Sequence, residues 1–347
     1  MKEGGVGFGK RPPPQAAQPG SPPPTDRFEV WAMAAGAKRL ENIAIGAGAG
    51  GERGVLAVAD VARGARILSV PARLALQVTT MEKAPSWCSA SAWSEARWDA
   101  RLAMKLLHEA DGPEPSLQPW LLQLPRQVTA PVLWDDQAAA FEAIAYPSLG
   151  RTVRSQRELW DAARAHAPGP PSAERWDWAM GIVRSRAFSG PYAGGTPFPF
   201  SGTFVGALIQ LFAAATLAIF YTLLSGNDDL ALDGFLAVAV YVGLTDLVFS
   251  PRASKARRYV LCPWVDFLNH DGALENSEVA YEYFADSFAV RLDWEAGDVE
   301  AGKEVKISYG ARSNDVLLQY YGFVQRDNPH DTYSQSGEHF CHVARSK

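Results

Sequence analysis

A stretch without any charged side chain, residues 187–227, constrains this 347-residue chain more than any other feature. Its centre, residues 204–224, is long and apolar enough to span a bilayer as a helix. A second apolar run, residues 230–249, is interrupted by Asp233 and Asp246, each of which costs about 2.5 to 3.5 kcal/mol at the centre of a membrane helix. The two runs together predict an apolar helical hairpin, inserted between the segments before and after it.

Two strand-like regions enclose a helical one. Short runs rich in β-branched residues and bounded by glycine or proline indicate strands, and apolar residues at helical spacing indicate helices. The expected strands include residues 54–58, 66–70, 288–292 and 305–309. The expected helices include residues 97–109, 137–144, 176–183 and 314–320. These patterns predict an α+β domain over residues 28–333, with a helical insert at about 86–185 and the apolar insertion at 189–258.

The two ends of the chain differ from this domain. The first 25 residues hold seven prolines and five glycines and no apolar run, so we expect a disordered tail over residues 1–27 and no secretory signal. Residues 334–347 form a second tail. Three basic residues near the start are compatible with an organelle transit segment, so the predicted location is intracellular, in the chloroplast or the cytoplasm, with membrane association through residues 204–249 as an alternative.

Composition excludes some classes of partner. The 33 basic and 38 acidic residues give a net charge of -5, which argues against broad electrostatic docking on nucleic acid. The three cysteines are far apart in the sequence, which favours neither a disulfide framework nor a zinc site of the CxxC type. His339, Cys341 and His342 could ligate zinc in principle, but no second ligand pair accompanies them. We therefore predict no metal.

One glycine motif resembles a dinucleotide fingerprint without its context. Gly46, Gly48 and Gly51 satisfy G-x-G-x-x-G after a strand-like run. The fingerprint requires a helix directly after the last glycine and an acidic residue about 20 positions later. Here a β-rich run follows, and residues 67–71 contain no acid. The motif predicts a flexible loop rather than a nicotinamide or flavin site.

Several separated motifs stand in order along the chain. They are GERGVLA at 51–57, Trp120 with Leu124-Pro125, SRAF at 185–188, PWVDFLNH at 263–270, VKISYG at 305–310, SN at 313–314 and YYGF at 320–323. Taken alone, each has an ordinary structural explanation, because an Asn-His pair after an apolar strand is usually a turn. As an ordered set they resemble the SET domains of the group that includes the plant Rubisco large-subunit lysine methyltransferase and the actin histidine methyltransferase.

The resemblance implies both a fold and an activity. The fold is a SET-domain β-fold in which the 263–270 and 305–310 segments cross in a knot-like arrangement. The activity is methyl transfer from S-adenosylmethionine to a protein substrate, with lysine as the expected acceptor. Two further readings stand beside it: histidine as the acceptor, and a non-catalytic, membrane-tethered SET-like protein that binds partners.

The resemblance also implies roles for particular residues. Tyr309, Tyr321 and Tyr281 match the tyrosines of the acceptor channel. The expected cofactor-binding residues are Glu52, Arg53, Gly54, Arg186, Asp266, Asn269 and His270. These residue types suit the reaction, because in-line displacement at a sulfonium needs a positioned, neutral amine. A narrow apolar channel beside a cation disfavours the charged ammonium of lysine, whose ordinary pKa is about 10.4.

The sequence departs from the family at two places. Residues 189–258 replace a short loop, and a single membrane crossing there would separate Arg186 from Asn269 across a bilayer. The number of crossings is therefore zero or two, which leaves a membrane hairpin, a soluble apolar insert or translated non-coding sequence. The chain also ends 24 residues after Phe323. Family members continue into a helical substrate-binding domain, so we expect that domain to be missing.

Overall fold

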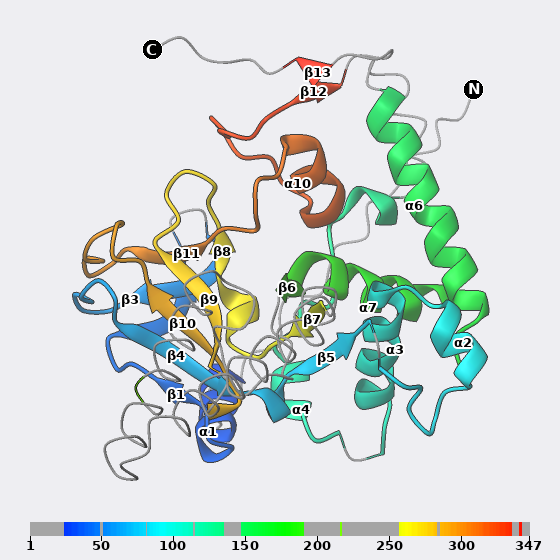
Figure 1. Cartoon of the computed structure of the whole chain (residues 1–347), viewed down its shortest axis with the longest axis horizontal. Helices are drawn as coiled ribbons and strands as arrows, with labels where there is room; N and C mark the ends of the chain where they lie inside the picture. Colours follow the sequence, from blue (N-terminus) through cyan, green and yellow to red (C-terminus); the bar gives the residue numbers. More distant parts are fainter. Residues whose placement is uncertain are drawn as a thin grey trace, which may run out of the picture.

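Strands lie on one side of the molecule and most of the helices on the other (Figure 1). The computed structural model describes residues 24–48, 51–80, 82–113, 115–134, 147–190, 216, 257–282, 285–334 and 340–341. A small sheet lies between the two sides, where the ribbons of both halves approach each other (Figure 1). This junction is where the candidate site described below is found.

The large sheet combines strands from the start and the end of the chain. Its order is β1-β4-β10-β9-β11-β3-β2, and β8 pairs with β11 off this path. The strands are β1 (Lys38–Arg39), β2 (Ile43–Ala47), β3 (Arg53–Ala57), β4 (Arg66–Pro71), β8 (Asn269–His270), β9 (Ser277–Glu282), β10 (Ser287–Leu292) and β11 (Glu304–Ile307). Because β10 pairs with β4 and β11 with β3, the two β portions of the sequence contribute to one sheet.

The small sheet joins both ends of the apolar insertion. Its order is β5-β7-β6, with β5 at Leu76–Thr79, β6 at Phe188–Gly190 and β7 at Arg258–Leu261. Gly190 and Arg258 are register partners in the antiparallel pair β6–β7. The two described ends of the insertion, Gly190 and Arg258, therefore lie opposite each other in the small sheet.

The apolar runs at 204–224 and 230–249 lie outside the described residues. Within the described part of the chain, no helix is both long and apolar enough to cross a membrane. The predicted apolar hairpin thus stays a prediction. The knot-like crossing also stays a prediction, although its two segments do lie together, since β8 and β11 pair in parallel with Ile307 opposite His270.

The helical half is built around α7. The helices are α2 (Ala90–Glu95), α3 (Trp98–Ala110), α4 (Gln118–Leu121), α6 (Pro147–Ala165), α7 (Ala173–Arg186) and α10 (Asn314–Tyr321). Helix α7 contacts α3, α6 and α10, and its N-cap Ser172 accepts a hydrogen bond from the Arg175 N–H at 3.3 Å. The expected helices at 97–109, 176–183 and 314–320 are confirmed, and the one at 137–144 lies outside the described residues.

Several short elements connect or follow the longer helices and strands. Three one-turn 3₁₀ helices lie at η1 (Ala72–Leu74), η2 (Pro131–Leu133) and η3 (Val265–Phe267). Strands β12 (Tyr333–Ser334) and β13 (Phe340–Cys341) pair with each other. Strand β13 falls within the segment expected to be a tail.

The N-terminal helix α1 (Pro24–Ala34) corrects two expectations. Residues 24–27 were expected in the disordered tail, and a strand-like unit was expected from Phe28. Phe28 and Ala32, four residues apart, are both fully buried, and the Phe28 ring lies 5.4 Å from the Trp264 ring and 5.5 Å from the Phe267 ring. Burial of this one helical face against the later motif explains the helix, because local periodicity alone is weak here.

A single hydrophobic core runs through both halves. Trp93, Trp120, Trp176 and Trp264 are among its largest fully buried side chains. The indole N–H of Trp176 donates to the Trp160 carbonyl at 2.8 Å, which satisfies its polar atom inside the core. Replacing such a tryptophan with alanine is expected to cost about 3–5 kcal/mol. The core therefore fixes the helical half against the sheet.

Candidate active site

A cavity of about 430 Å³ lies where α7, β6, β9 and the segment after β11 meet. Arg186 and Phe188 line one side, Asp266 and Leu268 another, and Tyr309 with Tyr321 a third. A smaller cavity of about 90 Å³ adjoins it and shares four lining residues. The shared residues are Ala187, Ser189, Arg312 and Tyr321. The two cavities thus form one cleft, whose larger part has the size of a small-ligand site.

Two stacked tyrosines stand in this cleft. Tyr309 follows β11 and Tyr321 ends α10, and their ring centroids are 4.7 Å apart. The Tyr309 hydroxyl donates to the carbonyl of Leu268 at 2.9 Å. Burial raises the pKa of Tyr309, and the neighbouring Tyr321 raises it further; burial also raises the pKa of Tyr321. Both phenols therefore stay neutral, and the Tyr309 oxygen keeps its lone pairs for another donor.

His270 holds the Tyr309 backbone. Its Nδ1 accepts a hydrogen bond from the Tyr309 N–H at 3.0 Å, and the two rings stack with centroids 4.9 Å apart. Burial lowers the pKa of His270. A neutral imidazole with its proton on Nε2 is the form that can accept this bond. The Asn-His pair and the SYG segment are thus brought together, as the sequence predicted.

Asp266 and Arg186 place opposite charges at the same wall. The Arg186 Nη1 donates to the Asp266 carbonyl at 2.8 Å, and the indole N–H of Trp120 donates to the Asp266 carboxylate at 3.1 Å. Burial raises the pKa of Asp266, although Arg186 and the Trp120 bond act to lower it. Asp266 Oδ1 and Arg186 Nε are buried without a hydrogen-bond partner among the described residues. One atom of each sign therefore remains to be satisfied.

The backbone leading to Asp266 is strained. Trp264 has a φ of 72°, a conformation that is a genuine outlier for a bulky residue. Its side chain is almost fully buried and lies 6.4 Å from the Phe267 ring. Packing therefore imposes the conformation, and residues held in this way cluster at functional sites.

Asn269 connects strand β8 to the hairpin of β2 and β3. Its Nδ2 donates to the Arg53 carbonyl at 3.2 Å and to the Glu304 carboxylate at 2.7 Å. Gly54 leaves the space for this contact, because a Cβ there would lie 2.2 Å from Glu304 Oε1 and 2.9 Å from Asn269 Nδ2. The Arg53 side chain turns to the helical half and donates to the Gln123 carbonyl at 2.6 Å. Glu52 is exposed beside it.

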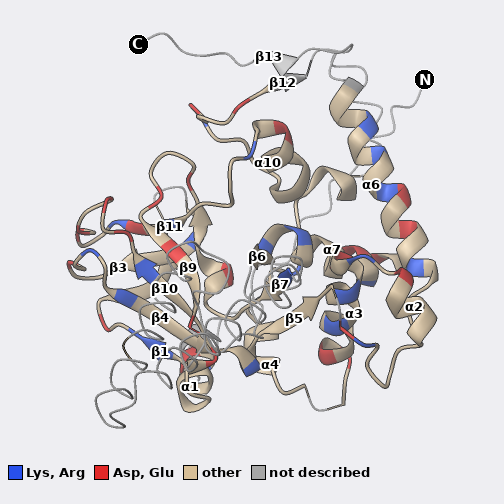
Figure 2. Cartoon of the chain, viewed as in Figure 1, with Lys and Arg blue, Asp and Glu red and all other residues tan. Residues whose placement is uncertain are grey.

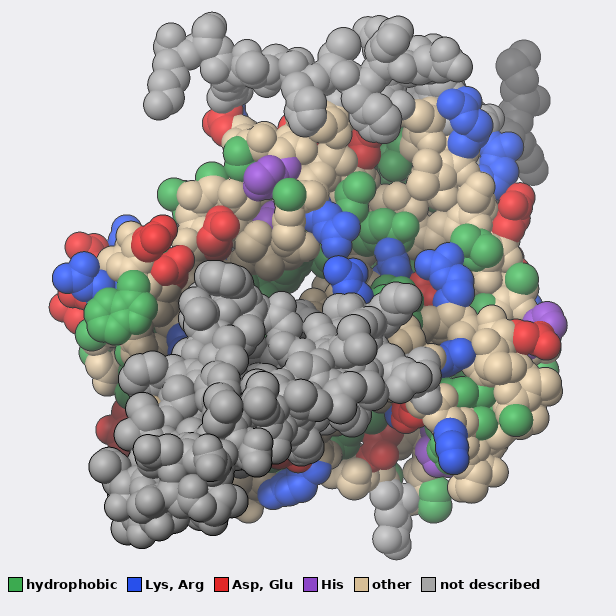
Figure 3. All heavy atoms as spheres, viewed as in Figure 1, with side chains coloured by type: hydrophobic (Ala, Val, Ile, Leu, Met, Phe, Trp, Pro, Cys, Tyr) green, Lys and Arg blue, Asp and Glu red, His purple; other side chains and the backbone are tan. Residues whose placement is uncertain are grey.

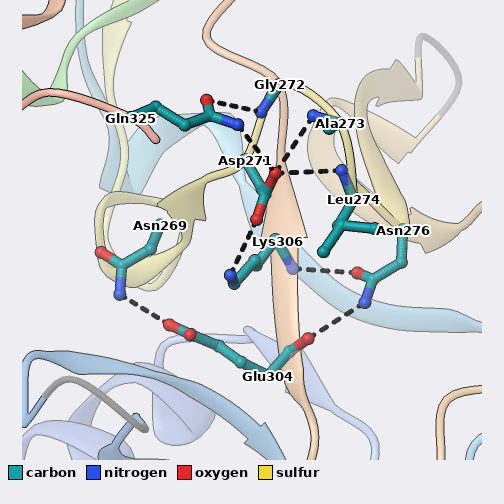
Figure 4. A network of polar contacts seen from close by, with 9 residues as sticks. All are labelled: Asn269, Asp271, Gly272, Ala273, Leu274, Asn276, Glu304, Lys306 and Gln325. Carbon is teal, nitrogen blue, oxygen red and sulfur yellow. Dashed lines mark hydrogen bonds and ion pairs between the residues drawn. The ribbon is translucent and has the colours of Figure 1, made fainter. Parts of the chain in front are cut away.

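Asp271 organises the loop after β8 (Figure 4). One carboxylate oxygen accepts from the Ala273 and Leu274 N–H groups, each at 3.0 Å, and from Gln325 at 3.2 Å. The other oxygen pairs with Lys306 on β11 at 3.0 Å. Burial acts to raise the pKa of Asp271, but these hydrogen bonds outweigh it and the pKa is lowered. This carboxylate fastens β8 to β11 directly beside His270.

Tyr281 is the predicted channel residue that lies apart from the others. Its hydroxyl donates to Asp286 at 2.5 Å in the turn between β9 and β10, and its ring packs on Phe288 at 5.3 Å. It does not line the cavity, whereas Ser277 and Val279 of the same strand do. The structure therefore gathers Tyr309, Tyr321, Arg186 and Asp266 in the cavity lining. His270 stacks on Tyr309 behind this lining, Asn269 contacts Arg53 and Glu304, and Tyr281 lies near the end of β9.

The glycine motif lies where two strands of a hairpin meet, and its first glycine, Gly46, is inside β2 rather than in a loop. Strand β2 ends at Ala47 and β3 begins at Arg53 in antiparallel register, and Gly51 has a φ of 78°. The chain thus continues after Gly51 as a strand, where a dinucleotide fingerprint would continue as a helix.

The zinc ligands considered at the C-terminal end are not placed as a group. Cys341 lies in β13, whereas His339 and His342 lie outside the described residues.

Sequence reasoning missed residues that act through backbone atoms or from neighbouring positions. The Leu268 carbonyl that accepts from Tyr309 has no sequence signal, since any residue could provide it. Glu304 and Asp271 each stand directly beside a recognised motif, so their position was the available signal. Arg312 lies between the ISYG segment and α10 and lines both cavities.

Solved structures with the same arrangement define the class of fold as that of SET domains. No protein-family model and no curated protein matches the chain. Rubisco LSMT bound to AdoMet matches with a TM-score of 0.58 at 18% identity, over 90% of this chain and 59% of that one. Rubisco LSMT bound to sinefungin and monomethyllysine gives 0.57 at 19% identity with the same coverage.

The SET domain of LSMT bound to lysine and AdoHcy gives a TM-score of 0.57 at 17% identity, over 89% of this chain and 59% of that one. At identities this low, the similarity establishes the fold alone. It is the SET-domain fold expected from the motifs. The chain spans 59% of the length of the structures that it matches.

Proposed function

We propose that this protein is an S-adenosylmethionine-dependent protein-lysine N-methyltransferase. The observation that carries the proposal is the Tyr309 hydroxyl, bonded to the Leu268 carbonyl at 2.9 Å within the stacked tyrosine pair of the cleft. The fold adds support, because the matched LSMT structures contain AdoMet or AdoHcy and lysine or methyllysine.

The cleft fits the amino-acid end of S-adenosylmethionine. That end carries a carboxylate and an ammonium group, and the cleft wall presents Arg186 and Asp266 side by side. Asp266 Oδ1 and Arg186 Nε each lack a partner among the described residues, so a zwitterion supplies the missing acceptor and donor. Asn269, His270 and the Glu52-Arg53-Gly54 segment would hold the remainder. When bound, this group supplies an electrophilic methyl on a sulfonium.

The residues of the chain position the acceptor. The neutral Tyr309 oxygen can accept a hydrogen bond from an amine, because its own proton is committed to Leu268. Tyr321 stacks behind it and limits the width of the cleft. A fixed nitrogen needs little further reorganisation to reach an in-line geometry. Positioning by Tyr309 and Tyr321 is therefore the main contribution of the chain.

The environment of the cleft also favours the neutral form of the amine. A lysine ammonium loses hydration on entering the cleft, which lowers its pKa. Arg186 and Arg312 line the cavity and add like charge. Tyr309 is a poor proton acceptor at neutral pH, because burial raises its pKa and keeps it as the phenol. The amine therefore loses its proton to water before it is positioned.

Histidine methylation and a membrane-tethered scaffold have less support. Lysine or methylated lysine is bound in three of the similar LSMT structures, which supports lysine rather than histidine as the acceptor. The membrane-tethered scaffold depends on residues 204–249, which the structure does not describe. Neither receives a specific observation in its favour, so lysine methylation remains the proposal.

Calorimetric titration of the full chain with S-adenosylmethionine tests the proposal. We expect saturable binding, weakened about tenfold or more in Arg186→Met, because a charge-assisted contact to the carboxylate is lost. Arg151→Gln on the exposed side of α6 is the matched control and should bind as the wild type does. Incorporation of a labelled methyl group into lysine, scored after hydrolysis, completes the test. Folded protein that neither binds the cofactor nor transfers the methyl group contradicts the proposal.

A further inference from the structure

Four arginines line the cleft of the two contiguous cavities. They are Arg184, Arg186, Arg257 and Arg312. Among the residues that the structure describes, the acidic ones in this lining are Asp266, which is buried, and Glu278, which is exposed. Figure 2 shows basic residues where α7, β6 and β7 meet, and Figure 3 shows basic side chains near the centre of the same face. The cleft is therefore locally basic although the whole chain has a net charge of -5.

Two of these arginines are already engaged. Arg186 donates to the Asp266 carbonyl at 2.8 Å. Arg184 pairs with Asp99 at 3.4 Å, and its guanidinium lies 3.9 Å from the centre of the Tyr320 ring. These contacts fix both side chains in the wall of the cleft.

The other two arginines stand at the mouth. Arg257 and Arg312 are exposed, and neither forms an ion pair with any carboxylate that the structure describes. Arg312 Nε donates to the Tyr309 carbonyl at 3.2 Å, which places its guanidinium next to the tyrosine pair. Two exposed cations beside the acceptor position are a recognition element for anions.

We infer that Arg257 and Arg312 select acceptor polypeptides with acidic residues beside the target lysine. The inference rests on the proposed function and names the substrate class for the same cleft. A positively lined cleft repels the lysine ammonium and helps to lower its pKa. Acidic neighbours on the substrate offset this repulsion during docking and leave the amine inside the cleft. Basic neighbours would add to the repulsion.

The geometry favours a polypeptide over a nucleic acid. The cavities hold about 430 Å³ and 90 Å³, which suits side chains rather than a continuous polyanion. Glu278 lies in the same lining and would repel a phosphate backbone. A single acidic side chain matches an arginine fork, because the fork accepts one carboxylate in a planar, bidentate contact.

Three peptides of equal length with one central lysine test the inference. They carry aspartate, asparagine or arginine at the two positions on each side of it. Fluorescence anisotropy with the full chain gives affinity, and transfer of a labelled methyl group gives kcat/KM. We expect the acidic peptide to exceed the neutral one about tenfold in both, and the gap to shrink in high salt.

Matched variants assign the effect to the two arginines. Arg257→Gln should reduce the preference for the acidic peptide about threefold or more, and Arg257→Glu should favour the peptide with flanking arginines. Arg312→Gln should act in the same direction, with an added loss of kcat because Arg312 touches Tyr309. Arg63→Gln, an exposed arginine beside the β10–β11 loop, is the control and should keep the preference. Circular dichroism checks that each variant is folded.

The outcomes separate this inference from the proposed function. Absence of transfer to all three peptides counts against the methyltransferase proposal, while anisotropy still measures the acidic preference. Equal affinity for all three peptides overturns the inference, even where transfer occurs. Displacement of the acidic peptide by a single-stranded oligonucleotide at lower concentration also overturns it, because the cleft would then recognise phosphate. An acidic preference that is unchanged in Arg257→Glu and Arg312→Gln overturns the assignment to these residues.

Discussion

The inner wall of the cleft and its mouth are built differently. Inside, functional groups hold one another: Tyr309 donates to the Leu268 carbonyl and receives support from His270 through its backbone. At the mouth, Arg257 and Arg312 are exposed and have no described carboxylate partner. The difference indicates two tasks. The inner wall is pre-organised for the proposed methyl transfer. At the mouth, the charges of Arg257 and Arg312 remain available to a docking polypeptide.

Pre-organisation explains why the inner wall tolerates unfavourable local features. Trp264 keeps a φ of 72°, and Asp266 is a buried carboxylate whose pKa is raised by burial. Each feature costs free energy that the surrounding core offsets. At the mouth no such cost arises, because exposed charges remain hydrated. Substitutions inside should therefore affect turnover or folding, and substitutions at the mouth should affect the choice of substrate.

The largest expected effect comes from removing the Tyr309 hydroxyl. Tyr309→Phe deletes the group that contacts Leu268 and would accept from the amine, so kcat should fall about 10²- to 10³-fold, as for loss of one positioned hydrogen-bonding group in other active sites. The ring and its stacking on Tyr321 remain, so affinity for S-adenosylmethionine should change by less than about twofold. Single-turnover transfer and calorimetry measure the two quantities. Unchanged turnover would contradict the role given to Tyr309.

A smaller effect, on stability, is expected for Asp271, whose carboxylate links β8 to β11 beside the inner wall. Asp271→Asn replaces a carboxylate that bonds two backbone N–H groups, Gln325 and Lys306 (Figure 4). An amide cannot accept from all four and leaves Lys306 without a counter-charge. We expect a loss of about 2 kcal/mol in the free energy of unfolding at pH 7, measured with urea. Asp293→Asn, where the carboxylate accepts from one exposed N–H, is the control and should cost less than about 0.5 kcal/mol.

The pH dependence of this loss has a definite sign. The pKa of Asp271 is lowered in the folded protein, so its stabilisation is fully present above the ordinary aspartate pKa of about 3.9. It is lost as the pH falls through the lowered value. The wild type should therefore exceed Asp271→Asn equally at pH 7 and pH 5 and lose this advantage below about pH 4. A difference that grows toward low pH would contradict the ion-pair explanation.

Much of the fold followed from local sequence patterns. Strands β4 and β10 and helices α3, α7 and α10 lie where periodicity and glycine boundaries placed them. Helix α1 did not, because it is stabilised by contacts of Phe28 with Trp264 and Phe267. Those residues are more than 230 positions later in the chain. Local sequence patterns cannot predict a helix that depends on such a distant contact.

Residues of the candidate site could be predicted from the sequence only where their residue type is part of a recognisable motif. Tyr309, His270 and Asp266 stand in ordered motifs, and the structure brings them together. The Leu268 carbonyl could not be predicted, because backbone acceptors have no residue signature. Arg257 gave no signal either, since it flanks the cleft only after β6 and the adjacent β7 pair, and Arg312 lies outside the recognised motifs. Spacing along the chain thus indicated the chemistry, and strand pairing decided which charges surround it.

The smallest effect is expected for Tyr281, which lies outside the cavity lining. Resemblance assigned Tyr281 to the acceptor channel, but its hydroxyl donates to Asp286 and its ring packs on Phe288, away from the cavity lining. Tyr281→Phe should therefore lower kcat by less than about threefold, and water should replace the lost donor at exposed Asp286. Stability should fall by about 1 kcal/mol or less. The same kinetic assay as for Tyr309→Phe provides the comparison, since both changes remove one phenol oxygen. A loss as large as that of Tyr309→Phe would place Tyr281 in the working channel and show that β9 rearranges when substrate binds.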